Sequence, residues 1–524
     1  MEPFLETKDI QGNIEPGFRM PFQKIYALRI SKATETASLV RYLLPMVTSM
    51  QEAMDFHEIR INKAKTTGQF GFKSYQLITE NKCWLNVSLG RDLLKKLKIE
   101  AASEQDSSFA AGLYAKSKSL GDPTNIDNPG NPNKWVVGYG SNISDMFLIF
   151  ASNSSDYLES RTADILYQMQ SIATFEIIYQ ERAERLADDT EHFGFKDGIS
   201  QPDIRGVVQT HPVVYYNPRT IVSGNNDPAQ PEYSSPGRIL LWPGQFIFGY
   251  PVQSDVSYRD PVMVTTDPIL KNGSFLVFRR LRQLVKEFYA YTDGVAASLA
   301  KLDTCYAKPD YLRSKIIGRD KASSNSLLQA TNTNPLLINH FLYADSLVDM
   351  QLQDGTTVTS PVSDPLGLVC PFFAHIRKVN PRDSITNRWN DRNTLKLRIM
   401  RRGIPFGPKY DHENTANPSN DQERGLLFLS YQTKINQFEI LINDWVNSQA
   451  NPEAGDGIDM LIGQQRPLGD ANSCTAKLTV NGQPFQLSNM TDFVVPTGGE
   501  YLFTPSITLL KKLSATEIKK DDKQ

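Results

Sequence analysis

The strongest constraint on the fold is the order of apolar segments in the first 180 residues. Period-two alternation at 24–30 predicts a strand, and apolar residues at helical spacing within 34–60 predict a helix. The full set of predicted elements is strand 24–30, helix 34–60, paired strands 75–78 and 83–89, helix 91–97, strand 145–151, helix 156–169 and strand 171–180. The main elements follow the order strand–helix–strand–strand–helix–strand, which is that of the ferredoxin-like fold.

A similar pattern returns later in the chain. Residues 217–237 are rich in Asn, Pro, Ser and Gly and predict a linker. Beyond it we predict strands at 275–280, 372–377, 395–400, 425–431 and 500–505, helices at 284–299 and 435–446, and irregular segments at 320–337, 354–364 and 451–470. The predicted fold class is therefore α+β with two ferredoxin-like halves: an N-terminal domain at 1–216, the linker at 217–237, a C-terminal domain at 238–515 and a frayed tail at 516–524.

Composition excludes several function classes. The 524 residues carry 56 basic and 58 acidic side chains, so the net charge of −2 favours neither nucleic acid nor an anionic membrane. No apolar run approaches the roughly 20 residues that span a bilayer, and the N-terminus does not have the pattern of a signal peptide. The four cysteines, at 83, 305, 370 and 474, show no metal-binding spacing and are interpreted as buried reduced thiols. We therefore expect a cytoplasmic protein.

The segment 193–202, Phe-Gly-Phe-Lys-Asp-Gly-Ile-Ser-Gln-Pro, is the first candidate for a functional site. Gly194 and Gly198 flank Asp197, and glycine allows both positive φ and close approach of the backbone to a ligand. A rigid turn of this kind would present the carboxylate of Asp197 to a large neighbouring group.

Two later segments carry the other candidates. Residues 370–382 read Cys-Pro-Phe-Phe-Ala-His-Ile-Arg-Lys-Val-Asn-Pro-Arg, and 397–407 read Leu-Arg-Ile-Met-Arg-Arg-Gly-Ile-Pro-Phe-Gly. His375 stands between an apolar and a basic stretch, so we expect a strand to carry it from the core to the rim of a pocket. Neutral imidazole is a common axial ligand of haem iron, although most isolated histidines are structural.

Together these segments resemble the dye-decolourising peroxidase family of haem proteins, and its larger members in particular. Four further motifs support the resemblance over most of the chain: Asp-Ile-Gln-Gly-Asn-Ile at 9–14, Pro-Gly-Gln-Phe at 243–246 with Gly-Tyr-Pro at 249–251, Gly-Ser-Phe-Leu-Val-Phe-Arg at 273–279, and Gly-Gly-Glu-Tyr-Leu-Phe-Thr-Pro-Ser at 498–506. One departure is Gln245, where Glu is expected in relatives.

The resemblance implies one haem b per chain, bound in the C-terminal half, and a peroxidase reaction. Hydrogen peroxide would oxidise the haem to an oxoferryl intermediate, which bulky aromatic, phenolic or dye-like donors would reduce in one-electron steps. His375 would be the proximal ligand of the iron. Asp197 would act as base and then acid, for which its pKa would have to rise through burial against a nearby cation. Arg401 would supply that fixed cation, with Arg402 pointing elsewhere.

Other assignments from the resemblance concern the walls of the pocket. Arg382, or alternatively Arg377, is a candidate partner for a haem propionate, because arginine pairs bidentately with carboxylates. The remaining candidates for haem contact are Gly194, Phe195 and Gly198 in the turn, and Leu426 and Phe428, which alternate along a predicted strand.

Two positions stay open at this stage. The proximal His should donate its free N–H to a carboxylate, for which Glu439 and Asp444 are candidates. Electrons from a donor too large to reach the haem would enter through Trp389 or a tyrosine.

Two other functions are compatible with the same motifs. One is haem handling, such as porphyrin chemistry or iron release, and the other is non-catalytic haem binding. We expect hydrogen peroxide and an aromatic reductant as small-molecule partners, and neither nucleic acid nor membrane. Manganese oxidation and a homo-oligomeric state are left open.

Overall fold

The N-terminal half forms a four-stranded antiparallel unit with the strand order expected for a ferredoxin-like fold. The computed structural model describes residues 3–207, 220–222, 232–330, 337–344, 349–351, 355–359, 361–388, 391–453, 457–464, 474–489 and 492–516. The strands of this half are β1 (Phe22–Ile30), β2 (Cys83–Gly90), β3 (Met146–Ser152) and β4 (Phe175–Glu184). They pair in the order β4-β1-β3-β2, and α1 (Thr36–Leu43) and α8 (Ser155–Ile172) complete the unit.

The C-terminal half repeats the same order. Its strands are β9 (Ser274–Gln283), β13 (Ile404–Phe406), β14 (Gly425–Gln432) and β17 (Val494–Thr504), which pair in the order β17-β9-β14-β13. Helix α9 (Val285–Leu299) follows β9 in the chain, and helix α13 (Asn436–Ile440) follows β14. A π-helical turn at Leu441–Val446 continues α13. Both predicted halves are confirmed.

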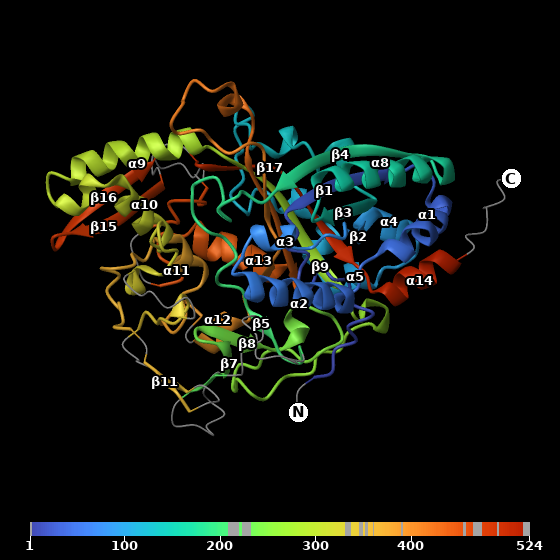
Figure 1. Cartoon of the computed structure of the whole chain (residues 1–524), viewed down its shortest axis with the longest axis horizontal. Coiled ribbons are helices and arrows are strands. Elements are labelled where there is room, and N and C mark those ends of the chain that lie inside the picture. The colour runs from blue at the N-terminus through green and yellow to red at the C-terminus, as the bar shows by residue number, and fades with distance from the viewer. Residues whose placement is uncertain are drawn as a thin grey trace.

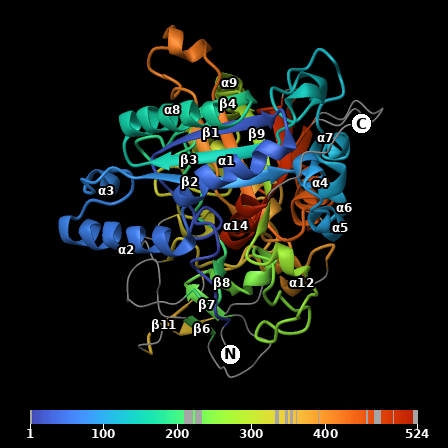
Figure 2. The same cartoon turned by 90° about the vertical axis from the view of Figure 1, so that its right-hand side faces the viewer.

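The two halves close into one barrel. β2 pairs with β17 at one seam, where Gly90 lies opposite Leu502, and β4 pairs with β13 at the other, where Ala183 lies opposite Phe406. The short strand β12 (Met400–Arg401) adds to β14. Figures 1 and 2 show the long strands in the middle of the molecule, with α8 over β1 and β4 and with α9 and α10 (Pro309–Ile317) at the opposite end of the long axis.

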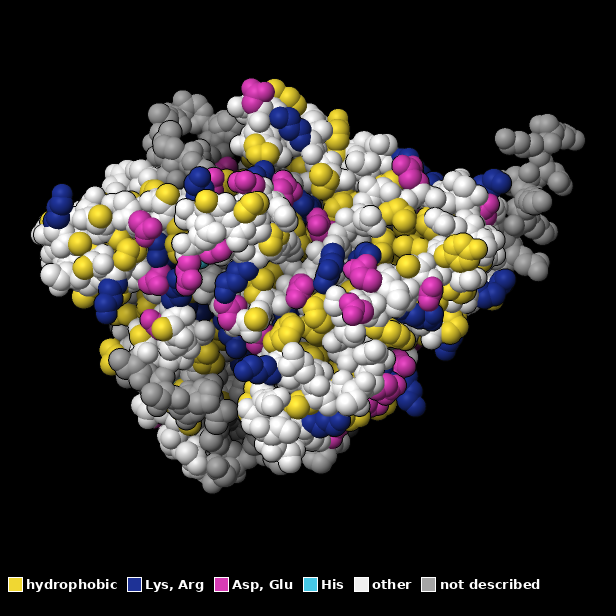
Figure 3. Space-filling view, turned by 45° about the horizontal axis from the view of Figure 1, so that its top comes forward, with side chains coloured by type: hydrophobic (Ala, Val, Ile, Leu, Met, Phe, Trp, Pro, Cys, Tyr) yellow, Lys and Arg dark blue, Asp and Glu magenta, His cyan; other side chains and the backbone are white. Residues whose placement is uncertain are grey.

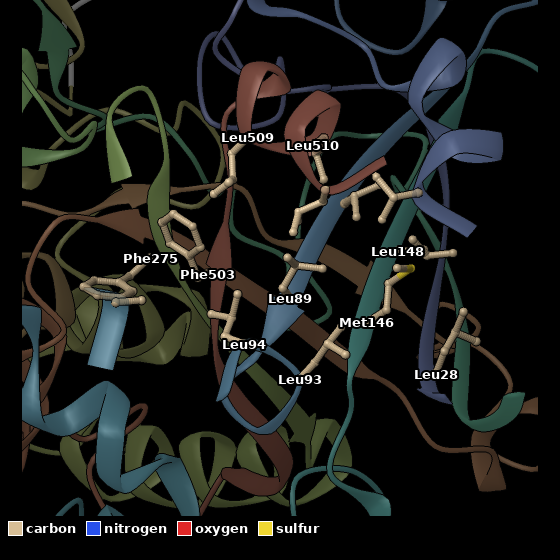
Figure 4. Close-up of a cluster of buried hydrophobic side chains, with 14 of the residues drawn as sticks. Leu28, Leu89, Leu93, Leu94, Met146, Leu148, Phe275, Phe503, Leu509 and Leu510 are labelled. Atoms are coloured by element: carbon tan, nitrogen blue, oxygen red, sulfur yellow. The ribbon is translucent and has the colours of Figure 1, made fainter. Parts of the chain in front are cut away.

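Both faces of β3 and β17 are buried, which explains the continuous apolar sequence of β3, whereas β4 exposes charged side chains on its outer face. In β1, Ile25 and Ala27 face the barrel interior, whereas Tyr26 and Leu28 face the helices outside. Figure 4 shows the outer cluster, where Leu509 and Leu510 of α14 (Ile507–Ala515) lie over Leu89 and Leu94. The C-terminal helix thus covers strands of the N-terminal half.

The remaining elements lie around the barrel. The helices are α2 (Met50–Thr67), α3 (Lys73–Gln76), α4 (Arg91–Lys96), α5 (Ala101–Gln105), α6 (Ser107–Ala111), α7 (Leu113–Lys116), α11 (His375–Val379) and α12 (Asp391–Leu395). A six-stranded sheet has the order β11-β10-β6-β7-β8-β5, formed by Thr357–Val358, Met350–Gln351, Thr220–Val222, Glu232–Ser235, Arg238–Leu241 and Asp203–Ile204. β15 (Cys474–Val480) and β16 (Gln483–Asn489) form a hairpin. In the part of the chain that the structure describes, no helix has the length and hydrophobicity to cross a membrane.

Several predicted elements were wrong. The helix at 34–60 is broken after α1 and restarts at Ser49, whose side chain and Glu52 form a capping box for α2. The predicted strand at 75–78 overlaps the end of helix α3. The predicted strand at 372–377 is instead a turn followed by helix α11, and 395–400 is the end of α12 and a turn before β12. The described parts of the predicted linker, 220–222 and 232–237, contribute strands β6 and β7.

Basic and acidic side chains do not segregate into separate patches on the face of the molecule drawn in Figure 3. Figure 3 shows basic and acidic groups intermixed over one face of the molecule, in keeping with the net charge of −2. Of the described cysteines, Cys370 is buried, Cys83 is half-buried and Cys305 is exposed, so the prediction that all the thiols are buried was wrong for Cys305.

Candidate active site

A large cavity opens beside the barrel and brings the predicted functional segments together. Its empty volume, including the solvent at its mouth, is about 1440 Å³. The turn at 195–200, helix α11 and strands β12 and β14 all contribute to its walls. Asp197, Arg401 and His375, which are separated by up to 204 positions in sequence, all line this one cavity.

The turn that carries Asp197 needs its glycines. Gly194 has φ of +89° and Gly198 has φ of +76°, a region that side chains with a Cβ rarely adopt. A Cβ at Gly194 would also approach Lys321 to 3.0 Å, whereas the space around Gly198 is open. Gly198 and Phe195 line the cavity, but Gly194 faces Lys321 and Tyr289 instead. The structure therefore does not place Gly194 as a cofactor contact.

Asp197 is held by two donors on a single oxygen. The Arg401 guanidinium donates to Oδ1 at 2.7 Å, and the backbone N–H of Gly198 donates to the same atom at 2.6 Å. Burial acts to raise the pKa of Asp197, but the charge of Arg401 and these hydrogen bonds outweigh it, so the pKa lies below its ordinary value. Burial thus acts in the expected direction, but the opposing cation prevails, and the net rise that the acid role was expected to need does not occur. Among the described contacts, Oδ2 accepts no hydrogen bond and remains available to a ligand.

The backbone of Arg401 is fixed by the same turn. Gln201 donates through Nε2 to the carbonyl of Arg401 at 3.1 Å and accepts from its N–H through Oε1 at 3.2 Å. Arg402 points the other way, where its guanidinium donates to the Ile14 carbonyl and to Glu15, as predicted. The side chain of Arg401, at the end of β12, therefore points into the cavity, whereas that of the next residue, Arg402, points to the N-terminal segment.

His375 begins helix α11 and presents its ring to the cavity. Nδ1 lies 2.7 Å from Oδ2 of Asp459, a fully buried carboxylate. The other oxygen of Asp459 accepts the backbone N–H groups of Leu461 and Ile462, so the carboxylate is fixed in position. Within the described residues no contact engages Nε2 of His375. This nitrogen is therefore free to bind a ligand, because a partner at one ring nitrogen leaves the other for coordination.

The predicted carboxylate partners of His375 were wrong. Glu439 accepts from Ser108 and Tyr501, and Asp444 pairs with Arg388 at 2.8 Å. Asp459 lies in a segment predicted to be irregular, and nothing in its local sequence distinguished it from a surface aspartate.

Three arginines give one part of the cavity an unbalanced positive charge. Arg319, Arg382 and Arg398 line it, and in the described part of the chain none of them has a carboxylate within ion-pair distance. Arg382 donates to the carbonyls of Asn339 and Phe341, yet its buried Nε has no partner. Burial, then the neighbouring Arg382, lower the pKa of Arg398 to about 9 and that of Arg319 to about 10. Arg319 is buried and Arg382 and Arg398 are half-buried, and no carboxylate among the described residues neutralises the three charges.

Arg377 does not share this environment. It belongs to α11 and is fully buried, and it pairs bidentately with Glu453 at 2.7 and 2.8 Å and stacks on Tyr343 and Phe372. Because its charge is satisfied away from the cavity, the alternative that placed Arg377 on a propionate is wrong.

Apolar side chains cover much of the remaining wall. Leu426 and Phe428 alternate along β14 and both line the cavity, so they share one face as predicted. Phe195, Leu397, Leu441 and Leu461 are among the other apolar residues of the lining. Trp389, the predicted exit point for electrons, lies outside the described residues.

These features fit haem. The cavity has an apolar lining for the porphyrin, an imidazole nitrogen free for iron and a cluster of three cations, unpaired among the described residues, for the propionates. The unpartnered Nε of Arg382 is one of these signs, because it lines the cavity and buried polar donors usually have a partner, although other arginines such as Arg279 and Arg424 also carry an unpartnered donor. No group of three or more His, Cys, Asp or Glu that could hold a bare metal ion occurs among the described residues.

A second, polar cavity meets the first at Asp197. Its empty volume is about 1390 Å³, and it shares Glu191, Lys196, Asp197, Gly198, Arg401 and Leu426 with the first cavity. Asp197 and Arg401 can thus be reached by a small polar molecule without passing through the apolar cavity.

Comparisons with known proteins agree with this arrangement. The family model "DyP dimeric alpha+beta barrel domain" matches residues 9–183, and "Dyp-type peroxidase, C-terminal" matches residues 299–458. The dye-decolorizing peroxidase msp1 of Mycetinis scorodonius is 30% identical over 97% of this chain and 87% of that protein. The dye-decolorizing peroxidase AauDyP1 of Auricularia auricula-judae is 28% identical over 97% of this chain and 86% of that protein.

Solved structures show the same fold. An ancestral D-type dye-decolorizing peroxidase has a TM-score of 0.73 at 25% identity, covering 98% of this chain and all of that one. A dye-decolorizing peroxidase solved in complex with 2,6-dimethoxyphenol has a TM-score of 0.69 at 25% identity with the same coverage. The barrel built from two ferredoxin-like halves, the cavity lined by Asp197, His375 and Arg401, and the extent of these similarities show that the chain belongs to the dye-decolourising peroxidase family and is a peroxidase.

Proposed function

We propose that this peroxidase binds one haem b in the apolar cavity and uses hydrogen peroxide to oxidise bulky aromatic or phenolic donors in one-electron steps. The observation that carries the proposal is the placement of His375, with Nε2 free, and the Asp197–Arg401 pair on one cavity whose other lining arginines have no carboxylate partner among the described residues. Overall, one hydrogen peroxide and two phenolic donors, each of which loses one electron and one proton, give two waters and two donor radicals.

Each residue has a separate task in this proposal. His375 would hold the iron, and Asp459 would fix the ring and make its ligating nitrogen more basic. Arg382, with Arg319 and Arg398, would hold the propionates. When bound, haem supplies the redox centre that takes two oxidising equivalents from peroxide and gives them to donors one at a time.

Asp197 and Arg401 would act on the peroxide itself. Oδ1 is occupied by Arg401 and Gly198, so Oδ2 is the atom that would take a proton from the inner peroxide oxygen and return it to the outer one. The lowered pKa keeps Asp197 ionised and ready to accept that proton near neutral pH. Arg401 would stabilise the negative charge that develops as the O–O bond breaks.

A phenolic donor is supported by the relative whose structure contains 2,6-dimethoxyphenol. Haem handling is less well supported, because it would use Asp197 and Arg401 only to dock a substrate, which does not require a carboxylate held beside a fixed guanidinium. The cytoplasmic location remains a prediction from sequence, as does the division into domains at 217–237.

The test is reconstitution with haem followed by oxidation of 2,6-dimethoxyphenol with and without hydrogen peroxide. We expect stoichiometric haem uptake and peroxide-dependent turnover, with turnover lost in Asp197→Ala and haem binding lost in His375→Ala. Uptake of haem without turnover would favour haem handling or storage, and no uptake would contradict the proposal.

A further inference from the structure

A second carboxylate, Glu191, lies behind the turn that carries Asp197. Its Oε2 accepts the N–H of Phe193 at 2.8 Å, and its Oε1 accepts the N–H of Phe195 at 3.0 Å. The backbone N–H of Glu191 in turn donates to the carbonyl of Phe195 at 2.8 Å. One side chain therefore closes the loop that leads into Asp197.

This loop is also tied to the barrel through Glu191. Gln283, the last residue of β9, donates through Nε2 to Oε2 of Glu191 at 2.6 Å. Because β9 is a central strand of the C-terminal half, this hydrogen bond anchors the turn to the barrel. Both Glu191 and Gln283 line the apolar cavity, and Glu191 also lines the polar one.

We propose that Glu191 is a positioning residue for the peroxide reaction: by binding two backbone N–H groups of the turn and the Gln283 amide, it sets the place of Asp197 beside Arg401. This inference rests on the proposed function, because it assigns Asp197 to that reaction. A carboxylate suits the task because it presents two acceptor oxygens to three donors. An amide at this position presents one acceptor oxygen and turns its own NH₂ towards an N–H donor.

The energetic setting supports a functional role over a merely stabilising one. Burial raises the pKa of Glu191 to about 7, with the hydrogen bonds from Phe193, Phe195 and Gln283 opposing the rise and the charge of Asp197 adding to it. The fold thus retains, next to its catalytic turn, a carboxylate whose negative charge is costly to bury. Stability is commonly sacrificed in this way at functional sites.

The test compares Glu191→Gln with Asp188→Asn, a matched change three residues earlier in the same loop. Asp188 also accepts hydrogen bonds, from the N–H and hydroxyl of Thr190, but it is a surface residue paired with Lys409 and lies outside both cavities. Glu191→Ala is a second variant, and the near-isosteric Gln change covers the case in which Ala does not fold.

The first readout is hydrogen–deuterium exchange of the haem-free chain, which does not depend on activity. We expect exchange of the segment 190–198 to be about tenfold faster in Glu191→Gln than in wild type, the effect of losing roughly one hydrogen bond. Asp188→Asn should leave exchange at Phe193 and Phe195 unchanged, and the thermal midpoints of the two variants should agree within a few degrees.

The second readout is the rate of the haem-loaded enzyme with peroxide. We expect kcat/KM for peroxide to fall about tenfold or more in Glu191→Gln, because small displacements of a catalytic group are costly. KM for 2,6-dimethoxyphenol and haem occupancy should be unchanged. Unchanged exchange at 190–198, or faster exchange with a peroxide rate equal to that of Asp188→Asn, would overturn the inference. If wild type itself does not react with peroxide, the proposed function fails, while the exchange experiment still decides whether Glu191 holds the turn.

Discussion

At the scale of single residues, the ionic pair of Asp197 and Arg401 determines the acid–base behaviour of the site. Arg401 is the main group that keeps the pKa of Asp197 below its ordinary value against the effect of burial. If Asp197 is the base, as proposed, it is ionised across the neutral range and should lose that function only as the pH falls through the lowered pKa.

Arg401→Gln should move the acid limb of the pH profile. Without the guanidinium, burial raises the pKa of Asp197, so kcat/KM for peroxide should begin to fall at a higher pH than in wild type. The measurement is the pH profile of kcat/KM, with Lys409→Gln on the surface as the control. An acid limb at the same pH in wild type and Arg401→Gln would show that Asp197 is not the titrating base.

Asp459 provides a separate prediction on the other side of the cavity. Asp459→Asn removes the charge behind His375 while keeping the size of the side chain, and should lower haem affinity roughly tenfold or more. Asp444→Asn is the matched control, because Asp444 pairs with Arg388 at the surface. Haem affinity would be measured by competition with apomyoglobin. Equal affinity in the two variants would show that Asp459 does not support haem binding.

The sequence identified the three residues that the structure brings together, but not the residues that hydrogen-bond to them or surround them. Asp197, His375 and Arg401 stand in distinctive motifs, whereas Asp459, Glu191 and the cation cluster occur in ordinary local sequence. Their significance depends on contacts across 84 residues in the case of His375 and Asp459 and 92 in the case of Glu191 and Gln283. Such pairings have no local signature in a single chain.

At the scale of elements, long buried strands were predictable and short segments at the site were not. β3 is buried throughout, and its apolar run identified it. By contrast, α11 has only five residues, too few for a helical period to be recognised after the apolar run at 372–374. The helix is determined by tertiary contacts, such as the burial of Arg377 against Glu453.

The docking of α14 onto the barrel gives a prediction about an element. Leu510 is buried against the outer cluster, so Leu510→Ala should lower the free energy of unfolding by about 2–5 kcal/mol. Its exposed neighbour Lys511 provides the control, and Lys511→Ala should change the stability by less than about 0.5 kcal/mol. Denaturant unfolding of the two variants measures the difference. Equal stabilities would show that α14 is not part of the cooperative fold.

At the scale of the whole molecule, the closed barrel unites the two halves into one structure. β2 pairs with β17 and β4 with β13 across the predicted boundary at 217–237, which itself stays a prediction. Sequence could not show these seams, because each half already satisfies the ferredoxin-like pattern by itself.

Buried carboxylates in the barrel make global stability depend on pH. Burial raises the pKa of Glu500, on β17, from its ordinary 4.5 to about 7, with hydrogen bonds from Ser144 opposing the rise. A raised pKa means that the folded state binds the proton more tightly, so stability is greatest below pH 4.5 for this group and is lost as pH rises to about 7. The loss is on the order of 3 kcal/mol. Glu500→Gln should therefore reduce the fall in stability between pH 5 and pH 8, as measured by denaturant unfolding, and an unchanged fall would contradict this assignment.

The most direct test of the account is stopped-flow mixing of the haem-loaded protein with one equivalent of hydrogen peroxide, comparing wild type with Asp197→Asn. If Asp197 is the base that moves the peroxide proton, the second-order rate constant should fall about 100-fold or more in the variant, within the range for loss of a general acid–base group. Haem content and the spectrum of the resting protein should be unchanged. Equal rate constants in wild type and Asp197→Asn would contradict the central claim that this carboxylate, held beside Arg401, carries out the proton transfer.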